Sequence, residues 1–175
     1  MLTTERLILR PWWDDDLERF AAINADPEVM RFFPAPLSRA ESDAFVARIM
    51  VHAMQHGFGI WAVEAPKVAP LIGMVGLRRV GPEFSFAPAV DVSWRLGRPW
   101  WGRGYATEAA RAAIADGFAR FGIEEIVAST AAVNTPSRAV MERLGMTHDP
   151  ADDFLHPRIP ADSILRRHVL YRLRR

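Results

Sequence analysis

The chain has 175 residues, half of them hydrophobic, with a formal net charge of +1 and no cysteine. This length suits a single domain over residues 1–175 with a buried core, and the nearly neutral charge excludes a general attraction to nucleic acid or to a membrane surface. The lack of cysteine excludes disulfides, thiolate metal sites and cysteine nucleophiles, and the lack of an apolar run near the roughly 18 residues of a membrane span predicts a cytoplasmic protein.

The N-terminal half of the chain alternates strand and helix signals. Residues 2–10 alternate as a strand does, and the acidic run 14–16 precedes apolar residues at helical spacing, which indicates a helix with negative charge at its positive end. Ser38 and Glu41 have the spacing of a capping box and begin a second helix, which Gly57 ends. Three strands are expected next, over residues 60–64, 71–80 and 88–96.

The last of these strands leads directly into a glycine-containing turn and a long helix. Residues 90–96 place apolar side chains on one face and Asp91, Ser93 and Arg95 on the other, and small and apolar residues recur at helical spacing after the turn. The first turn of a helix has unpaired N–H groups, and glycine lets a phosphate approach them without a Cβ in the way. The segment 101–108 therefore predicts an anion site for a phosphate or pyrophosphate.

Alone, this turn is weak evidence, because glycine is as common in ordinary loops. No Gly-Lys-Ser/Thr follows it, so the lysine-bearing loop of P-loop NTPases is absent, and the three-glycine dinucleotide fingerprint is incomplete. The segments 134–138 and 144–146, one predicted strand further along the chain, strengthen the signal.

The C-terminal part is predicted to contain a short strand, a helix and a final strand, over residues 126–130, 136–144 and 165–173. Residues 154–164 form a proline-containing loop that either covers a substrate or simply connects two strands. The end of the chain is locally basic, and a solvated edge strand is the favoured explanation.

With these motifs the sequence resembles the acyl-CoA-dependent N-acyltransferases of the GNAT superfamily, most closely their ribosomal-protein-alanine N-acetyltransferase branch. The resemblance implies an α/β fold of the α+β type, a single GNAT-like domain with a mixed, mostly antiparallel, twisted sheet flanked by helices. It also implies acetyl-CoA as the co-substrate, and relatives are often homodimers. The five motifs that carry it occur in the family's order, at residues 6–11, 26–30, 71–77, 100–108 and 134–146.

The resemblance also implies a donor site. The backbone of the turn would hold the pyrophosphate, the strand edge near Leu96 would pair with the pantetheine arm, and Asn134 and Ser137 would flank that arm. Arg103 and Arg138 either help to bind the CoA phosphates or are solvated surface residues. The expected donor-site residues are Leu96, Gly102, Arg103, Gly104, Tyr105, Ala106, Thr107, Asn134, Ser137 and Arg138.

The sequence departs from the family pattern at two positions. Trp101 stands where the family prefers Gln or Arg, which removes one side-chain contribution but leaves the backbone N–H groups. Met141 stands where many relatives have a tyrosine that protonates the leaving thiolate, and methionine has no acidic proton. The tyrosine general-acid mechanism is therefore not transferred to this chain.

Asp91 is the candidate catalytic base or ammonium anchor, with an ion pair to Arg95 on the same strand face as the alternative. Trp94, Arg95 and His156 are the candidate acceptor-binding residues. Glu108 is expected to be structural, because negative charge is favoured in the first turn of a helix. No pair of histidines has a third ligand nearby, so no metal site is expected.

Three acceptor hypotheses remain open. At pH 7.4 an α-amino group is about a quarter to a third unprotonated, against about 0.1% for lysine. A site without a strong base therefore suits an α-amine, and the favoured acceptor is a protein N-terminus, which would need an open groove. A small-molecule amine, such as an amino acid, polyamine or antibiotic, would instead need a closed pocket roofed by residues 154–164. The third possibility is a non-catalytic, regulatory acyl-CoA-binding module.

Overall fold

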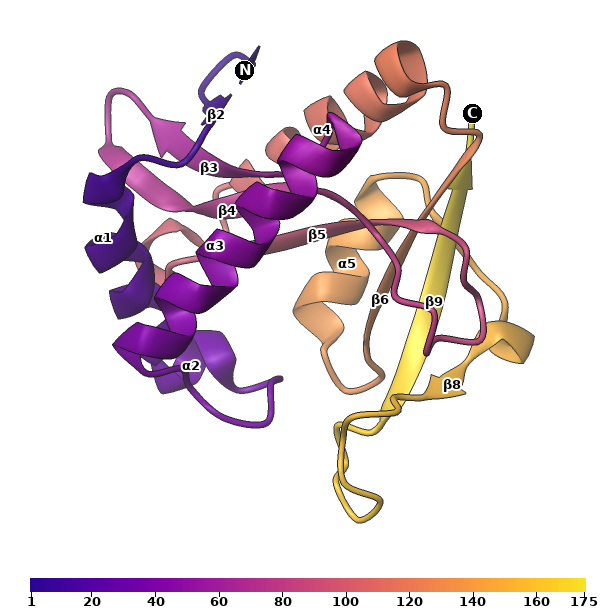
Figure 1. Ribbon diagram of the computed structural model, residues 1–175. Helices are drawn as coiled ribbons and strands as arrows, with labels where there is room; N and C mark the ends of the chain where they lie inside the picture. The colour runs from indigo at the N-terminus through magenta and orange to yellow at the C-terminus, as the bar shows by residue number, and fades with distance from the viewer.

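The computed structural model describes residues 1–175 and shows one mixed sheet with helices on both faces (Figure 1). The strands lie in the order β1-β2-β3-β4-β5-β6-β9-β7, with β8 paired to β9, and every neighbouring pair except β5–β6 is antiparallel. This confirms the expected mixed, mostly antiparallel sheet. The strands are β1 (Leu2–Thr3), β2 (Ile8–Arg10), β3 (Ile60–Ala65), β4 (Ala69–Arg79), β5 (Val90–Leu96), β6 (Glu125–Ala131), β7 (Thr147–His148), β8 (Phe154–Leu155) and β9 (Arg167–Arg174). The helices are α1 (Asp14–Ala25), α2 (Pro27–Met30), α3 (Arg39–His56), α4 (Tyr105–Phe121) and α5 (Thr135–Arg143), with 3-10 turns η1 (Arg98–Trp100) and η2 (Pro150–Asp152).

Helices α1 and α3 pack on one face of the sheet, with α3 in front of the strands in Figure 1. Both helices begin as the sequence predicts. The Asp16 carboxylate accepts a hydrogen bond from the Trp13 N–H at 2.8 Å, and Ser38 and Glu41 form a capping box. Their apolar sides and the strands beneath them enclose a core of Trp12, Phe20, Val46, Ile49, Ile60, Ala62, Leu71 and Met74.

Helix α4 packs on the opposite face, where small residues let it lie close to the strands. Ala109, Ala110 and Ala113 are fully buried. At Gly117 an added Cβ would lie 2.6 Å from Leu77 Cδ1 on β4, so any side chain there would force the Leu77 side chain to move. The position of the N-terminus of α4 is therefore fixed by packing along the length of the helix.

The parallel pair β5–β6 leaves an opening in the sheet. Only the first two residues of β5 pair with β6, and the strands separate beyond them. The Gly97 N–H donates to the Ile72 carbonyl on the β4 side at 2.9 Å. Alternate residues of a strand turn their backbone groups to the same neighbour, so Trp94 and Leu96 turn theirs away from β4 and into the opening.

Strand β9 corrects the expectation of a solvated basic edge, because it lies between β6 and β7. Its arginines are paired with carboxylates on neighbouring elements. Arg172 contacts Glu125 and Asp152, each at 2.7 Å, and Arg174 contacts Glu125 at 2.9 Å. The basic residues thus join the last strand to its neighbours.

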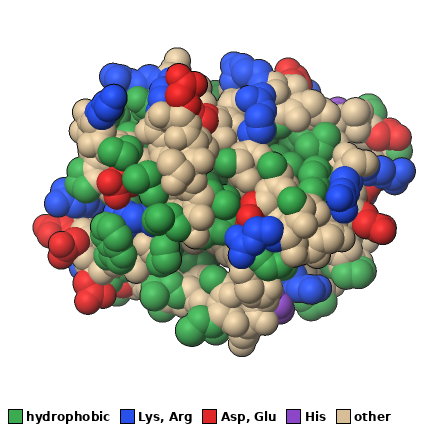
Figure 2. Space-filling view, turned by 90° about the horizontal axis from the view of Figure 1, so that it is seen from above, with side chains coloured by type: hydrophobic (Ala, Val, Ile, Leu, Met, Phe, Trp, Pro, Cys, Tyr) green, Lys and Arg blue, Asp and Glu red, His purple; other side chains and the backbone are tan.

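The surface carries charges of both signs. On the face shown in Figure 2, basic and acidic side chains alternate around the rim, with hydrophobic side chains between them. None of the helices combines the length and the apolar character needed to cross a membrane.

Candidate active site

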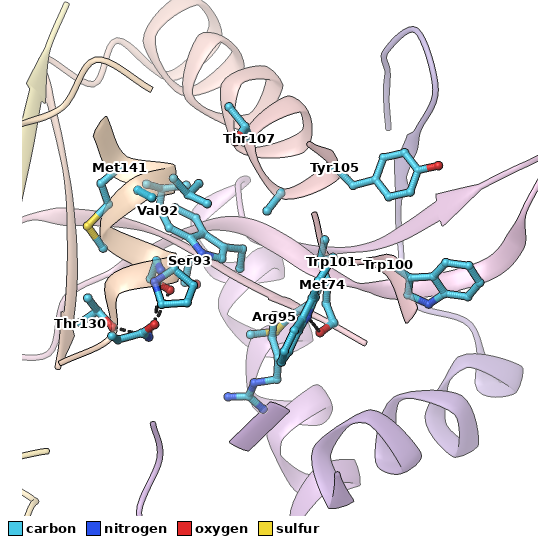
Figure 3. Close-up of a pocket in the computed structure, with 18 of the residues that line it drawn as sticks. Met74, Val92, Ser93, Arg95, Trp100, Trp101, Tyr105, Thr107, Thr130 and Met141 are labelled. Atoms are coloured by element: carbon cyan, nitrogen blue, oxygen red, sulfur yellow. Dashed lines mark hydrogen bonds between the residues drawn. The ribbon is translucent and has the colours of Figure 1, made fainter. Parts of the chain in front are cut away.

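A cavity of about 1000 Å³ occupies the opening between β5 and β6 and extends to both faces of the sheet. Its walls come from β5, the loop after it, the first turn of α4, α5, and aromatic residues near α2 and α3 (Figure 3). Of the sequence-predicted residues, the following line it: Asp91, Trp94, Arg95, Leu96, Gly102, Gly104, Tyr105, Ala106, Thr107, Asn134 and Ser137. The structure therefore brings together most of the expected site.

One end of the cavity is the glycine turn before α4. Gly102 and Gly104 have φ values of 71° and 79°, a left-handed conformation that disfavours any residue with a Cβ. Gly104 is the N-cap and supplies no side-chain cap, so the first N–H groups of α4 have no side-chain partner. A Cβ added at Gly102 would meet nothing within 4 Å. The turn therefore offers open space and free N–H groups, which suit an anion.

Glu108 has the structural role that the sequence predicts. Its carboxylate accepts hydrogen bonds from the Thr4 hydroxyl at 2.6 Å, from the Arg6 N–H at 2.9 Å and from Arg6 Nε at 2.7 Å. Burial acts to raise the pKa of Glu108, but these hydrogen bonds and the charge of Arg6 outweigh it and hold the pKa below its usual range. The carboxylate ties the start of the chain to α4, and Arg6 offsets its charge beside the anion site.

Asn134 lies at the N-cap of α5 and organises the next part of the wall. Its Nδ2 donates to the Thr130 hydroxyl at 2.8 Å and to the Ser137 hydroxyl at 3.2 Å, and its Oδ1 accepts from the Ser137 N–H. Met141 lies one turn after Ser137 and is 1% exposed. The position of the usual tyrosine is thus filled by a buried thioether.

The two arginines expected at the donor site, Arg103 and Arg138, do not line the cavity, whereas two arginines of α4 and α5 do. Arg138 donates to the Ala132 carbonyl and to the Tyr171 hydroxyl, and Arg103 lies beside the Trp100 ring. Arg111 and Arg143 line the cavity, and Arg111 donates to the carbonyl of Arg143 at 3.2 Å. Sequence reasoning missed Arg111, although its spacing of four from Thr107 places both on one face of α4.

The other end of the cavity contains the polar face of β5. Asp91 is 6% exposed and binds Arg78 of β4 at 2.8 and 3.3 Å, so the alternative ion pair with Arg95 is wrong. Arg78 stands directly opposite Asp91 in the strand register, about 5 Å away, whereas a residue four positions along a strand is about 13 Å away. Arg95 instead donates to Asn24 Oδ1 on α1 at 2.6 Å.

Trp101 closes one side of the opening in an unexpected way. Its indole Nε1 donates to the carbonyl of Leu96 at 2.8 Å, a hydrogen bond drawn as a dashed line in Figure 3. The indole thus satisfies the backbone carbonyl of Leu96.

His156 is not brought to the cavity, and neither is any other residue of 154–164. The ring of His156 lies 4.8 Å from that of His168 and 5.2 Å from that of Phe84. Burial, together with the nearby His156, lowers the pKa of His168 to about 4. No group of three or more His, Cys, Asp or Glu side chains is arranged to hold a metal ion.

Comparisons with known proteins show the family to which the fold belongs. A family model described as an acetyltransferase (GNAT) domain matches residues 6–147. FsC-acetyl coenzyme A-N(2)-transacetylase of Aspergillus fumigatus is 31% identical over 154 residues, which span 84% of this chain and 65% of that protein. The chain thus spans just under two thirds of the length of this relative.

Solved structures show the same fold. The acetyltransferase of Agrobacterium tumefaciens matches with a TM-score of 0.80 and 27% identity, over 99% of this chain and 94% of that one. RimL, a ribosomal L7/L12 alpha-N-protein acetyltransferase in complex with coenzyme A, matches with a TM-score of 0.78 and 14% identity, over 99% of this chain and 96% of that one. The second likeness concerns the fold alone.

Proposed function

This chain belongs to the GNAT family of acetyltransferases, the acetyl-CoA-dependent N-acetyltransferases, and on that premise we propose that its acceptor is an α-amino group, with a protein N-terminus favoured. The observation that carries the proposal is the cavity between β5 and β6, which joins an uncapped helix N-terminus to a polar strand face on the other side of the sheet. Such a cavity can hold a donor and an acceptor at once.

The residues around the cavity fit the phosphate and pantetheine parts of acetyl-CoA. The N–H groups at the start of α4 would bind the pyrophosphate, and the cationic Arg111 and Arg143 lie on the same side. Asn134 and Ser137 would flank the pantetheine arm. The carbonyl of Leu96 already accepts from the Trp101 indole, and the remaining backbone groups of the β5 edge at Trp94 and Leu96 would pair with the amides of that arm. A backbone N–H there would polarise the thioester carbonyl.

The site favours direct attack by an amine that is already partly unprotonated. The cavity wall offers no tyrosine at the position of Met141, and the chain has no cysteine to form an acyl intermediate. An α-amino group has a pKa near 7.8, against about 10.4 for lysine, which amounts to roughly 3.5 kcal/mol in the cost of deprotonation. An α-amine thus needs far less help from a protein base.

Asp91 suits the role of ammonium anchor. Each of its oxygens accepts one hydrogen bond from Arg78 and keeps a lone pair for a second donor. Asp91→Asn is expected to raise the KM of the amine about tenfold or more, because it removes the charge that attracts the ammonium group. The pH profile of kcat should keep its shape. A displaced alkaline limb in steady-state kinetics would instead assign Asp91 the role of base.

A small-molecule amine is the second candidate acceptor. It is supported by the fungal relative, whose name describes an N(2)-transacetylase of FsC. The closed pocket that such an acceptor was expected to need would use residues 154–164 as a roof, and none of them lines the cavity. The homodimer and the cytoplasmic location stay predictions.

The proposal is tested by thiol release from acetyl-CoA with a panel of peptides and small amines. We expect peptides with free N-termini to be acetylated, with kcat/KM rising with pH to a plateau whose apparent pKa is near 8, that of the free α-amine. Peptides with a blocked N-terminus and an internal lysine are the matched control. Tight CoA binding without turnover on any amine would contradict the proposal and favour the regulatory module.

A further inference from the structure

Arg95 is a buried arginine without a carboxylate partner. It is 8% exposed, its Nη1 donates to the Asn24 amide oxygen at 2.6 Å, and its Nε is buried with no partner. The other buried arginine, Arg10, binds the carboxylates of Asp16 and Glu64. A buried charge is costly unless it is compensated, and a neutral amide satisfies one N–H without cancelling the charge.

The surroundings of Arg95 stabilise the guanidinium only in part. Its Cζ lies 4.4 Å from the ring centroid of Phe33 and 5.4 Å from that of Phe45, and aromatic faces attract a cation weakly. Burial, with a smaller contribution from Arg78, lowers the pKa of Arg95 to about 10. The group is still cationic at neutral pH, so its charge is available to a ligand.

The other cations at this end of the cavity are already paired. Arg78 binds Asp91 at 2.8 Å, and Arg31 lies 3.6 Å from Glu28. Arg95 therefore supplies one positive charge that no anion of the wall balances.

Ser93 adds a second unsatisfied group on the same strand face. Its hydroxyl oxygen is buried and has no hydrogen-bond partner. Ser93 lies two residues before Arg95, about 6.6 Å along β5, and both line the cavity. Figure 3 shows the Arg95 side chain extending away from the helix that carries Thr107.

This pair lies on the acceptor side of the sheet. Arg95 contacts Asn24 of α1 and Phe45 of α3, whereas the glycine turn begins α4 on the opposite face. Val92 and Leu96, which alternate with these residues, belong to the core beneath α4. The phosphates of the donor, bound at α4, would therefore not reach Arg95.

We propose that the guanidinium of Arg95 and the hydroxyl of Ser93 bind a carboxylate of the acceptor, so that the acceptor is an amine that also carries a carboxylate. The inference rests on the proposed acetyl transfer and defines its substrate class. The carboxylate is either that of a free amino acid or that of an Asp or Glu side chain at a peptide N-terminus. A polyamine is disfavoured, because it would place a cation beside an uncompensated guanidinium.

Matched acceptors test this proposal by steady-state kinetics. Alanine against alaninamide, compared as kcat/KM for the unprotonated amine so that their different amine pKa values do not enter, examines the α-carboxylate. Peptide amides beginning with Asp against Asn examine the side chain. We expect kcat/KM to favour the carboxylate at least about tenfold in one of the two pairs. Arg95→Met should abolish that preference, so that kcat/KM for the carboxylate acceptor falls to the value for its neutral counterpart. Arg31→Met, which removes a paired cation of the same cavity, should keep the preference.

Direct binding keeps the proposal falsifiable if Arg95→Met does not fold. With wild-type protein and CoA, calorimetry would compare N-acetylalanine with its amide, and the N-acetyl amides of Asp and Asn. Equal affinity within both pairs, or no measurable binding of either carboxylate, overturns the proposal. Equal kcat/KM for the carboxylate and the neutral acceptor in both pairs overturns the carboxylate proposal but leaves the proposed acetyl transfer intact. Preferential binding of the carboxylate without turnover of any amine supports the role of Arg95 in carboxylate binding but contradicts the proposed acetyl transfer.

Discussion

Gly102→Ala is expected to weaken CoA binding at least about tenfold, or 1.4 kcal/mol. The residue has a φ of 71°, a Cβ there would meet no protein atom within 4 Å, and Gly102 lines the cavity beside the first turn of α4. In the donor site that we propose, the pyrophosphate approaches the backbone N–H groups of this turn. The methyl group and the strain of the left-handed conformation would both displace the anion. Isothermal titration calorimetry with CoA measures the change.

Gly122→Ala is the matched control for this experiment. Gly122 ends α4 with a φ of 62°, and a Cβ there also meets nothing within 4 Å. The helix of 17 residues puts it about 25 Å from the turn. Each substitution should lower the free energy of unfolding by about 1 kcal/mol, since alanine is strained at positive φ. CoA affinity unchanged by Gly102→Ala, or reduced equally by both, would contradict a pyrophosphate site at this turn.

The donor half of the site could be predicted from the sequence because its signals are local. The glycines at 102 and 104 and the helical spacing after them each depend on residues close in the chain, whereas Asn134 is expected there only from the family resemblance. Local backbone rules therefore sufficed to predict where a strand would lead into a helix, and the structure brings these residues to one cavity.

The acceptor half could not be predicted in the same way, because its partners come from distant segments. Asp91 pairs with Arg78 across a strand register, and Arg95 meets Asn24, which lies 71 residues earlier in the chain. Periodicity shows that Asp91 and Arg95 share a strand face, but it does not show what lies opposite that face. His156 was expected at the acceptor site and lies away from the cavity, because its neighbours also come from distant segments of the chain.

The position of the last strand in the sheet could not be predicted from the sequence for a related reason. A basic, alternating segment at the end of a chain is typical of an edge strand. Here β9 inserts between β6 and β7, and carboxylates from η2 and β6 balance its arginines. These carboxylates lie 20 and 47 residues away from Arg172, beyond the reach of a local pattern.

Arg10→Met is expected to lower the free energy of unfolding by about 3–5 kcal/mol, the largest effect on stability that we predict. Arg10 and Asp16 are each 2% exposed, and the guanidinium makes two hydrogen bonds to the Asp16 carboxylate at 2.7 and 2.9 Å. It also binds Glu64 at 2.8 Å and the Pro70 carbonyl at 2.8 Å. Methionine fills much of the same volume but leaves the Asp16 carboxylate buried without a counter-charge.

The double variant Arg10→Met with Asp16→Asn separates buried charge from lost packing. Asparagine keeps an oxygen for the Trp13 N–H and carries no charge, so the double variant should be more stable than Arg10→Met alone. Arg39→Met is the exposed control. Its pair with Asp43 has the same 2.8 Å contact on the surface of α3, and losing it should cost about 0.5 kcal/mol or less. Urea unfolding measures all three, and equal losses for Arg10→Met and Arg39→Met would show that burial of the Arg10 pair contributes nothing.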